Sequence, residues 1–414
     1  MATVKPFRAL RPTVQAAAGF ASLPYDVMDA GEARSMVARQ PSSFLQVTRA
    51  EVGLPEETDP HAPVVYEQAK AKLAKFVADG ILQKDQSDCY YVYRQQMGKH
   101  VQTGIAAVCK VSEYEAGVIK KHELTRPDKE QDRVDHISAT GAQTGPVFLT
   151  YRRNIEIAAQ VASVTEQPPT YDFTAEDRIR HTLWVMDDAE AILGIQEAFA
   201  KVERLYIADG HHRAAAAARV SRLSAGKNAG LFLAVLFPDD EVHILDYNRV
   251  VYSWGNVSRA DFLKLVRQKF DLAPATERGD STGKPSEAHV FGMYMSGVWH
   301  QLKPKAGSYD ENDRLARLDV NILQQNLLSP ILGIGDPRTD KRIGFVGGIR
   351  GMGELQMLVD KGYAVVAFSL FPTSVEELMA VADANDIMPP KSTWFEPKLR
   401  DGMVIHLIDK TFGS

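Results

Sequence analysis

Cysteine is scarce in this chain, and long apolar runs are missing. Cys89 and Cys109 are the two cysteines among 414 residues, too few for a disulfide framework or a zinc site made of thiolates. No apolar stretch approaches the roughly 20 residues that a membrane-spanning helix requires. The N-terminal segment Met1–Arg8 contains no apolar signal-peptide core. Together these absences predict a cytoplasmic protein with reduced thiols and no membrane segment.

An excess of positive charge is also missing. Lys and Arg number 48 against 53 Asp and Glu, which gives a formal net charge of −5. Such a chain does not attract a polyanion as a whole, and no helix-turn-helix or long basic arm is recognisable. We therefore expect no nucleic-acid partner. A hydrophobic content of 45% and a charged content of 24% are typical of a globular protein.

Several common catalytic motifs are absent from the sequence. There is no GxxxxGK[ST] phosphate loop, no HExxH, no paired CxxC and no GxSxG. No GxGxxG follows a predicted strand, and the glycine-rich segment 347–351 lacks that spacing. The motifs therefore give no support for three enzyme classes: a Walker-type nucleotidase, a Rossmann dehydrogenase and a zinc protease.

The most informative segment that is present runs from Leu205 to Ala218. Leu205–Ala208 predicts a short buried strand, and the five alanines Ala214–Ala218 predict a helix, because alanine has the best helix propensity. Gly210 between them permits a sharp turn, since glycine has no Cβ to clash. The predicted geometry places polar side chains at a helix N-terminus, where unpaired N–H groups and the helix dipole favour an anion.

The polar residues of this turn suggest phosphate chemistry. Arg213 could hold a phosphate with two hydrogen bonds while His211 and His212 donate hydrogen bonds or protons. Asp209 could bind a hydroxyl group or a Mg²⁺ ion carried in by a nucleotide. The structural alternative is that Asp209 caps the helix and Arg213 pairs with a surface carboxylate. No protein-held metal is expected, because adjacent helical residues point about 100° apart and no third ligand for the two histidines is apparent.

A second polar segment is Lys120–His136, which predicts a helix from Pro127 to about Thr140. Such a segment could line a polyanion site with Glu123 or Glu130 as a base, or it could be a solvated face with ion pairs. Spacing alone does not separate these readings. The polar turn Gln143–Pro146 follows, in a common location for ligand contacts. Three cationic residues of the helix share one face, at i, i+4 and i+7: Lys129, Arg133 and His136.

A third polar segment, Pro389–Lys398, contains two lysines, two hydroxyl side chains and a tryptophan. It could close over a ligand, or it could form a rigid surface loop whose aromatic residues cover the core. The chemistry of the residues favours the loop. Pro24–Val27 and Asp336–Asp340 could each contribute a carboxylate, and neither pattern is specific.

Alternating strand-like and helix-like segments predict a mixed α/β fold. Strands are expected at Tyr90–Arg94 and Ile105–Val111, joined by a polar loop that contains Gly98 and Gly104. A hairpin is expected between Leu231–Phe237 and Val242–Val251.

The chain is long enough for two or three domains. Residues 274–287, rich in Pro, Gly and polar side chains, are the best candidate for a linker. We therefore expect an N-terminal mixed α/β region over 1–165, a region with the Asp209–Arg213 turn over 166–273, and a C-terminal mixed α/β domain over 288–414.

The segment Ala208–Arg213, which reads ADGHHR and is followed by alanines, resembles the signature turn of the ParB/sulfiredoxin superfamily. Members of that superfamily bind nucleotide phosphates at this turn. They include partition proteins that use CTP, sulfiredoxins that use ATP, and free-serine kinases. In sulfiredoxins a cysteine stands where this chain has His211, so the resemblance does not extend to sulfinic-acid reduction. It implies a ParB/sulfiredoxin-like core around the strand, turn and helix.

The whole chain also resembles a widespread prokaryotic family of unknown function. The two resemblances together imply a kinase that acts on a small hydroxylated metabolite such as free serine. ATP or ADP is the implied nucleotide, with Mg²⁺ carried by it. The segments that carry the family resemblance extend from residue 6 to about residue 398: Pro6–Pro12, Pro24–Val27, His122–Pro127, Gln143–Pro146, Ala208–Arg213 and Pro389–Thr393.

The expected partners are a nucleotide and a small-molecule substrate, and a homo-oligomer is compatible with the sequence. A phosphatase or hydrolase that uses His211 or His212 is one alternative, and a nucleotide-binding switch protein without catalytic activity is another. The expected catalytic residues are Glu123, Asp209, His211 and His212. The expected nucleotide-binding residues are Gly210, Arg213, His122, Arg126, Arg133, Gln143 and Thr144. The expected substrate-binding residues are Lys391, Ser392 and Thr393.

Overall fold

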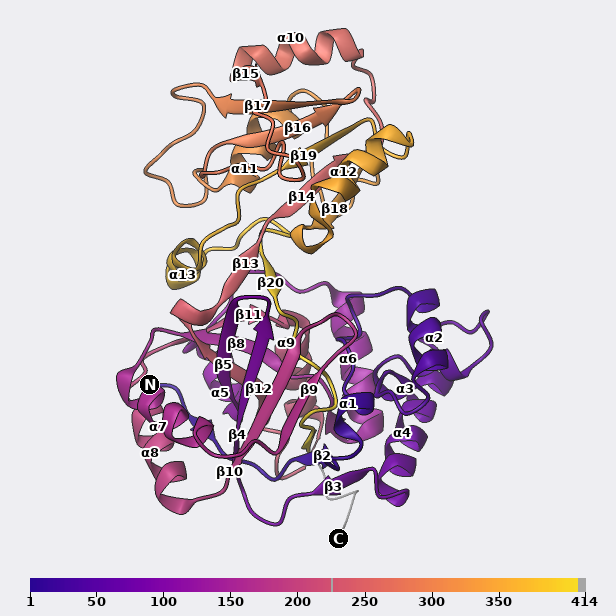
Figure 1. Cartoon of the computed structure of the whole chain (residues 1–414), viewed down its shortest axis with the longest axis vertical. Helices are drawn as coiled ribbons and strands as arrows, with labels where there is room; N and C mark the ends of the chain where they lie inside the picture. Colours follow the sequence, from indigo (N-terminus) through magenta and orange to yellow (C-terminus); the bar gives the residue numbers. More distant parts are fainter. Residues whose placement is uncertain (225, 409–414) are drawn as a thin grey trace. The chain divides into compact units, whose positions relative to one another are not determined.

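The computed structural model describes residues 1–224 and 226–408 (Figure 1). The chain forms two compact units. Unit 1 contains Met1–Val242 and the returning segment from Pro397, and unit 2 contains His243–Glu396. The mixed α/β class expected from the sequence is confirmed. Within the described ranges, every helix is too short or too polar to cross a bilayer.

Unit 1 is built around a large sheet, with nine strands among the described residues. Most neighbouring strands are antiparallel, but β6 pairs with β11 and β8 pairs with β12 in parallel. The strand β1 (Val4–Lys5) pairs with β5 beside the main order. That order is β6 (Ile119–Lys120), β11 (Leu205–Asp209), β8 (Val147–Tyr151), β12 (Leu231–Pro238), β5 (His100–Lys110), β4 (Tyr90–Met97), β10 (Arg180–Met186) and β9 (Tyr171–Thr174).

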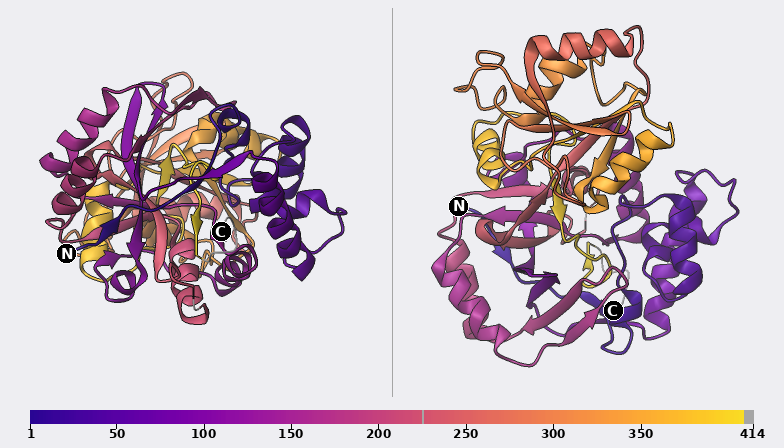
Figure 2. Two further views of the ribbon diagram at one scale, coloured as in Figure 1. Left: turned by 90° about the horizontal axis from the view of Figure 1, so that it is seen from below. Right: turned by 45° about the horizontal axis from the view of Figure 1, so that its top comes forward.

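Alternate residues of β5 and β12 face a core that they share with several helices, as expected for strands with one face on a core. The helices that contribute to this core are α5 (Val111–Glu115), α7 (Ile155–Thr165), α8 (Ala189–Phe199) and α9 (His211–Leu223). The magenta helices α7 and α8 lie at the opposite end of the unit from the indigo and violet N-terminal helices (Figure 2).

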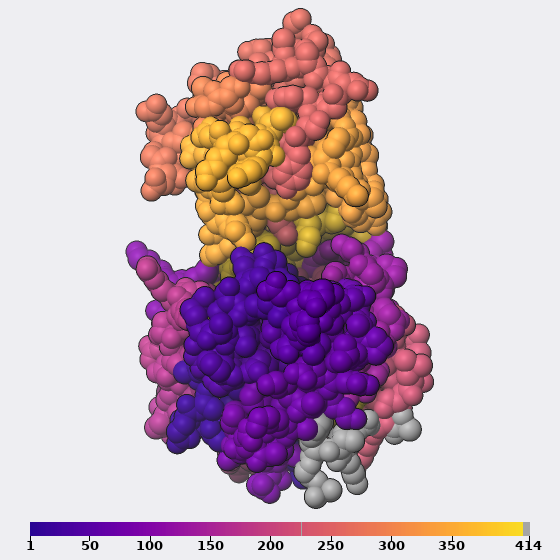
Figure 3. All heavy atoms as spheres, turned by 90° about the vertical axis from the view of Figure 1, so that its right-hand side faces the viewer, coloured from indigo at the N-terminus to yellow at the C-terminus, as the bar shows by residue number. Residues whose placement is uncertain are grey.

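The N-terminal helices cover another part of unit 1, and their indigo and violet residues form much of the unit 1 surface seen in Figure 3. Two short ribbons, β2 (Leu10–Pro12) with β3 (Leu82–Lys84) and β7 (Ala142–Gln143) with β21 (His406–Leu407), complete the unit. The helices of this part are α1 (Ala17–Phe20), α2 (Ala30–Arg39), α3 (Leu45–Thr48), the 3-10 turn η1 (Ala50–Gly53), α4 (Pro63–Ala78) and α6 (Pro127–Thr140). A further 3-10 turn, η2, spans Asp239–Glu241.

Unit 2 contains its own antiparallel sheet, which has six strands among the described residues. A short ribbon of β13 (His243–Leu245) and β20 (Trp394–Glu396) brings the two ends of the unit together. The strand order is β15 (Phe270–Pro274), β17 (Val298–Pro304), β16 (Phe291–Met295), β19 (Val366–Ser369), β14 (Tyr247–Val251) and β18 (Ile343–Gly347). The helices are α10 (Arg259–Lys269), α11 (Asp319–Leu323) with the π turn η3 (Gln324–Leu328), the 3-10 turn η4 (Gly348–Arg350), α12 (Gly351–Asp360) and α13 (Val375–Asp383).

Several sequence-based predictions of elements are confirmed and others are wrong. The helix over 127–140 and the strand–turn–helix around Gly210 are present. The hairpin of 231–237 with 242–251 is wrong, because β12 pairs with β5 and β8 while β13 and β14 pair within unit 2. The loop between β4 and β5 is a tight turn at Gly98, and Gly104 lies inside β5.

The predicted regions divide the chain differently from the two units. The strands β9 to β12 join β4, β5 and β8 in one sheet, so residue 166 does not begin a separate body. Residues 274–287 lie within unit 2, where β15 and β16 flank them and both pair with β17. Long-range strand pairing is invisible to composition, and the last six residues of the expected region 288–414 lie outside the described ones.

The close packing of α9 makes a testable prediction. Ala216 is fully buried where α9 contacts Val134 and Ile137 of α6. We expect Ala216→Leu to destabilise unit 1 by about 1–3 kcal/mol, because extra methyl groups must push the helices apart. Urea unfolding measures the change, and Ala159→Leu on the exposed face of α7 is the matched control. Equal stability of the two variants would contradict the packing described.

Candidate functional site

The turn between β11 and α9 depends on Gly210. Gly210 adopts φ +94°, a left-handed conformation that glycine tolerates, and it occupies the N-cap position of α9. A Cβ atom at this position would lie 3.0 Å from Nε of Arg213. Glycine therefore allows the Arg213 guanidinium to fold back over the turn. Gly210 also brings no side chain to accept hydrogen bonds from the first N–H groups of α9.

Asp209 is held by two cations of unit 1. Its Oδ2 accepts a hydrogen bond from Nζ of Lys398 at 2.9 Å, and its Oδ1 lies 3.7 Å from Nη2 of Arg213. Burial alone would raise the pKa of Asp209, but the charges of Lys398 and Arg213 outweigh burial and hold the pKa well below its ordinary value. Asp209 is therefore ionised at neutral pH. Arg213 therefore lies beside a carboxylate of its own turn. The structural alternative had expected it to pair with a carboxylate on the surface.

Arg213 is buried, with 9% of its surface exposed. Its Nη1 donates to the carbonyl oxygen of Pro146, whereas its Nε has no hydrogen-bond partner. Burial would lower the pKa of Arg213, but Asp209 and other carboxylates raise it, so the side chain stays charged. A buried guanidinium with an unused N–H is costly unless a further acceptor completes it.

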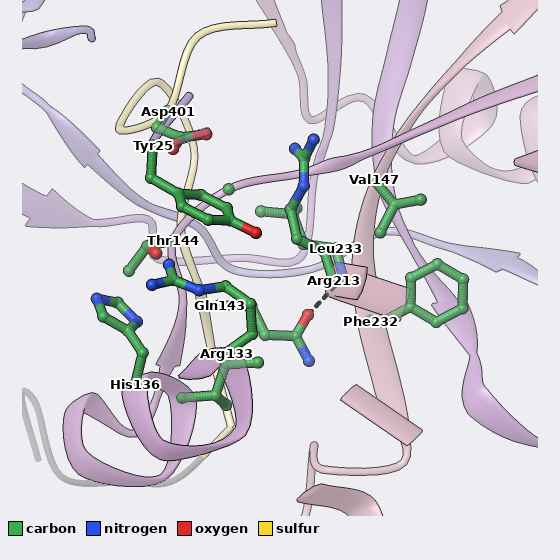
Figure 4. Close-up of a pocket in the computed structure, with 12 residues that line it drawn as sticks. Tyr25, Arg133, His136, Gln143, Thr144, Val147, Arg213, Phe232, Leu233 and Asp401 are labelled. Atoms are coloured by element: carbon green, nitrogen blue, oxygen red, sulfur yellow. Dashed lines mark hydrogen bonds between the residues drawn. The ribbon is translucent and has the colours of Figure 1, made fainter. Parts of the chain in front are cut away.

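Arg213 lines a cavity of about 410 Å³, counted with the solvent at its mouth. Figure 4 shows the side chains around this space, which come from the N-terminal segment, α6, β7 and the turn after it, β8, α9, β12 and the C-terminal segment. Its polar lining residues are Tyr25, Arg133, His136, Gln143, Thr144, Arg213 and Asp401.

Arg133 is the second buried guanidinium of the cavity. Its Nε and Nη2 donate to Oδ2 of Asp132, at 3.0 and 2.7 Å, and its Cζ lies 3.8 Å from the ring centroid of Tyr25. Burial lowers the pKa of the neighbouring His136 to about 4, so that ring is neutral at pH 7. Two of the three residues on the predicted helix face of Lys129, Arg133 and His136 therefore line the cavity, namely Arg133 and His136.

Gln143 and Asp401 have different roles in the lining. The Gln143 amide is engaged with β12, because its Oε1 accepts from the backbone N–H of Leu233 at 2.6 Å (Figure 4). Its Nε2 donates to the carbonyl oxygen of Leu231 at 2.9 Å. Asp401 is 1% exposed and its Oδ1 has no partner. Burial raises its pKa to about 7 against the opposing effect of Arg213.

A second group of polar residues lies at the start of α9. His122, Glu123 and His211 each offer a ligand atom within 4.8 Å of the others, so they could hold a metal ion. Burial lowers the pKa of His122 to about 4 and the pKa of His211 well below its ordinary value. His212 is separate from this group, because its Nε2 accepts from the backbone N–H of Arg126 at 3.0 Å.

The structure therefore brings most predicted site residues into unit 1. Arg126 is exposed, and its guanidinium pairs with Asp128 at 2.8 Å, outside the cavity lining. Lys391, Ser392 and Thr393 belong to unit 2, where Oγ of Ser392 donates to the carbonyl oxygen of Pro389. Their role in substrate binding stays a prediction.

Sequence reasoning missed Asp401 and did not single out Lys398. Both follow β20, on the segment with which the chain returns to unit 1. A bridge between Ser22 and Asp401 brings this segment to the N-terminal residues. An isolated carboxylate in a short loop carries no pattern, so composition and spacing could not have identified it. Tyr25 was noted with Pro24–Val27, but its packing on Arg133 had no sequence signal.

Unit 2 has a cavity of its own, of about 340 Å³ counted with the solvent at its mouth. It is lined by residues between 275 and 301, which include Arg278, Lys284 and His300. Burial lowers the pKa of His300. This cavity lacks a helix N-terminus among its lining residues, which lie in loops and strands.

Comparison with known proteins places the chain in a family. Residues 4–321 match the model of a family described as a protein of unknown function (DUF1015). The chain belongs to this family. No curated protein matches the chain.

The solved structures that match this chain are distant from it in sequence. A free serine kinase in complex with AMP has a TM-score of 0.38 and 11% identity, over 73% of this chain and 91% of that chain. SbnI with a C-terminal truncation, from Staphylococcus aureus, has a TM-score of 0.39 and 12% identity, over 72% and 86%. A conserved hypothetical protein from Pyrococcus furiosus has a TM-score of 0.36 and 13% identity, over 73% and 95%.

The raised pKa of Asp401 predicts a pH-dependent stability. Its folded-state pKa of about 7 lies above the ordinary value near 3.9, so its contribution is present at low pH and is lost as the pH rises towards 7. Between about pH 5 and pH 8, the free energy of unfolding of the wild type should fall by roughly 2–3 kcal/mol relative to Asp401→Asn.

Urea unfolding at both pH values measures this difference. Asp172→Asn is the control, because the hydrogen bond from Arg180 lowers the pKa of Asp172 and that carboxylate stays ionised over this pH range. A constant stability difference between wild type and Asp401→Asn at the two pH values would show that Asp401 is not perturbed by burial.

Proposed function

We propose that the protein is a nucleotide-dependent phosphotransferase that acts on a small hydroxylated metabolite such as free serine. The observation that carries this proposal is the pair of buried guanidinium groups, Arg133 and Arg213, on one cavity beside the start of α9. The carboxyl group that lines the cavity with them, Asp401, is partly protonated near pH 7. The lining therefore carries positive charge, which favours an anionic ligand.

The two arginines are positioned from behind by carboxylates that are not part of the lining. Asp132 holds Arg133, and Asp209 lies beside Arg213. These pairs neutralise part of the charge while they fix each guanidinium in place. Arginine binds phosphate with two parallel hydrogen bonds, so preorganised guanidinium groups suit nucleotide phosphates.

The N-terminus of α9 adds a second attraction for phosphate. A helix of 13 residues carries roughly half a positive charge at its N-terminus and directs unpaired N–H groups outward. Because Gly210 leaves those groups without an acceptor from its own side chain, a phosphate oxygen can take that place. The resemblance of ADGHHR to the nucleotide-binding turn of the ParB/sulfiredoxin superfamily supports the same assignment.

Phosphoryl transfer also needs a group that accepts the proton of the attacking hydroxyl. The bond from the acceptor oxygen to the terminal phosphorus forms as the bridging P–O bond of the nucleotide breaks, and Mg²⁺ carried with the nucleotide offsets the phosphate charge. Glu123, His211 and His212 are the candidates for the proton acceptor. Asp209, which stays ionised beside Lys398, is suited to orient the acceptor hydroxyl or the Mg²⁺.

Nucleotide binding is the first test of this proposal. Arg213→Ala should weaken the binding of ATP by roughly 10- to 100-fold, the loss expected for a charge-assisted hydrogen bond of about 1.5–3 kcal/mol. Isothermal titration calorimetry measures the affinity. Arg222→Ala is the matched control, because Arg222 lies on the last turn of the same helix and pairs at the surface with Glu115. Unchanged affinity in Arg213→Ala would refute the assigned phosphate site.

Turnover distinguishes a kinase from the alternatives. Phosphorus NMR should detect a new phosphorylated metabolite and ADP when ATP, Mg²⁺ and a panel of hydroxylated amino acids and small alcohols are supplied. Release of inorganic phosphate from phosphorylated metabolites without nucleotide would instead identify a phosphatase. Binding of ATP without turnover across the panel would favour a nucleotide-binding switch and contradict the phosphotransferase.

A further inference from the structure

We propose that His122, Glu123 and His211 form a site for one divalent transition-metal ion. One nitrogen or oxygen atom from each of these residues lies within 4.8 Å of the others. In a tetrahedral zinc site with a Zn–N distance of about 2.1 Å, the ligand atoms lie about 3.4 Å from one another. Closure around a metal therefore shortens the spacings between these ligand atoms, which reach 4.8 Å, by up to about 1.4 Å.

The fold explains why these residues meet although 88 positions separate Glu123 from His211 in the sequence. The strands β6 and β11 pair in parallel, with Leu205 opposite Ile119 and Tyr206 opposite Lys120. Parallel strands end at the same edge of a sheet, and this edge is where α/β sheets place ligands. The expectation of no protein-held metal considered His211 with His212 alone. It had no means of finding the two other ligands, His122 and Glu123, which lie across the sheet from His211.

The state of His122 is an independent observation that points to a ligand. His122 is 1% exposed, and neither of its ring nitrogens makes a hydrogen bond of good geometry, although the backbone of Ile207 lies close enough to oppose the lowering of its pKa. A buried polar group without a partner costs about 1–3 kcal/mol, and a metal ion would satisfy one of these nitrogens. The His122 and His211 rings lie edge to face with centroids 4.5 Å apart.

One existing contact must give way when the metal binds through Nε2 of His211. That atom accepts from the backbone N–H of His122 at 3.5 Å, a length at which a hydrogen bond contributes little. The metal would replace a weak contact with a coordinate bond. Coordination through Nδ1 of His211 would leave the contact in place.

The donor set selects the type of ion. Two imidazoles and one carboxylate suit zinc, iron, cobalt or manganese, whereas magnesium and calcium prefer oxygen donors. Three protein ligands also leave a coordination position open for water or for an oxygen of a ligand, as in catalytic zinc sites. This inference does not rest on the proposed nucleotide function. With the metal bound, Glu123 and His211 are ligands, and the proton-accepting role passes to His212 or to a metal-bound water.

Titration of the metal-free full-length chain with Co²⁺ tests the site without any nucleotide. Visible d–d absorption reports coordination, and competition with Zn²⁺ reports relative affinity. We expect saturation at one equivalent per chain and displacement of Co²⁺ by Zn²⁺, because zinc favours tetrahedral sites made of imidazole and carboxylate ligands. Glu123→Gln and His211→Ala should each weaken the affinity by roughly tenfold or more, whereas His100→Ala at the start of β5 should match the wild type.

The Glu123→Gln variant keeps this test decisive if removal of a buried histidine prevents folding, because Glu123 is half-buried and glutamine has the same shape. Circular dichroism of each variant confirms that it is folded. Binding without saturation at one equivalent, or equal Co²⁺ affinity in the wild type and Glu123→Gln, would overturn the proposal. Loss of metal binding with ATP affinity intact in these variants would separate this site from the nucleotide site.

Discussion

The parallel pairing of β6 with β11 is the constraint on which the candidate site depends. It places the segment after Lys120 beside the segment after Asp209, so that a loop and a helix start share one edge of the sheet. Gly210 then turns the chain sharply enough for α9 to begin at His211. A slip of this register would separate His122 from His211.

The packing of α9 extends this constraint to the cavity. Its alanine side chains allow α6 to approach, and α6 carries Arg133. Small side chains on one helix thereby bring a second guanidinium to the cavity of the first. Each arginine has a carboxylate beside it, Asp132 for Arg133 and Asp209 for Arg213, because a buried cation without compensation is expensive. The cavity is charged, yet its charges are held in fixed positions.

Local features of the sequence were sufficient to predict the strand, the glycine turn, the helix of alanines and the helix over 127–140. These features depend on the strand or helix propensity of neighbouring residues and on the single glycine at position 210. The residues that determine each feature therefore lie close together in the sequence. Pairing across the sheet is not encoded in that way, which is why the hairpin after β12 and the boundary at residue 166 were wrong. The same limit hid Asp401, whose burial and raised pKa arise from a return of the chain after unit 2. Arg133 and Arg213 were predicted as binding residues, but their meeting in one cavity required the packing of α6 on α9.

The central claim is that nucleotide phosphates bind in the unit 1 cavity at the start of α9. Hydrogen–deuterium exchange, measured by mass spectrometry with and without saturating ATP and Mg²⁺, tests that location directly. Bound nucleotide should slow exchange in peptides that cover 207–214 and 143–147 and leave exchange unchanged over 275–301 in the cavity of unit 2. Protection confined to 275–301, or unchanged exchange at 207–214 with bound nucleotide, would contradict it.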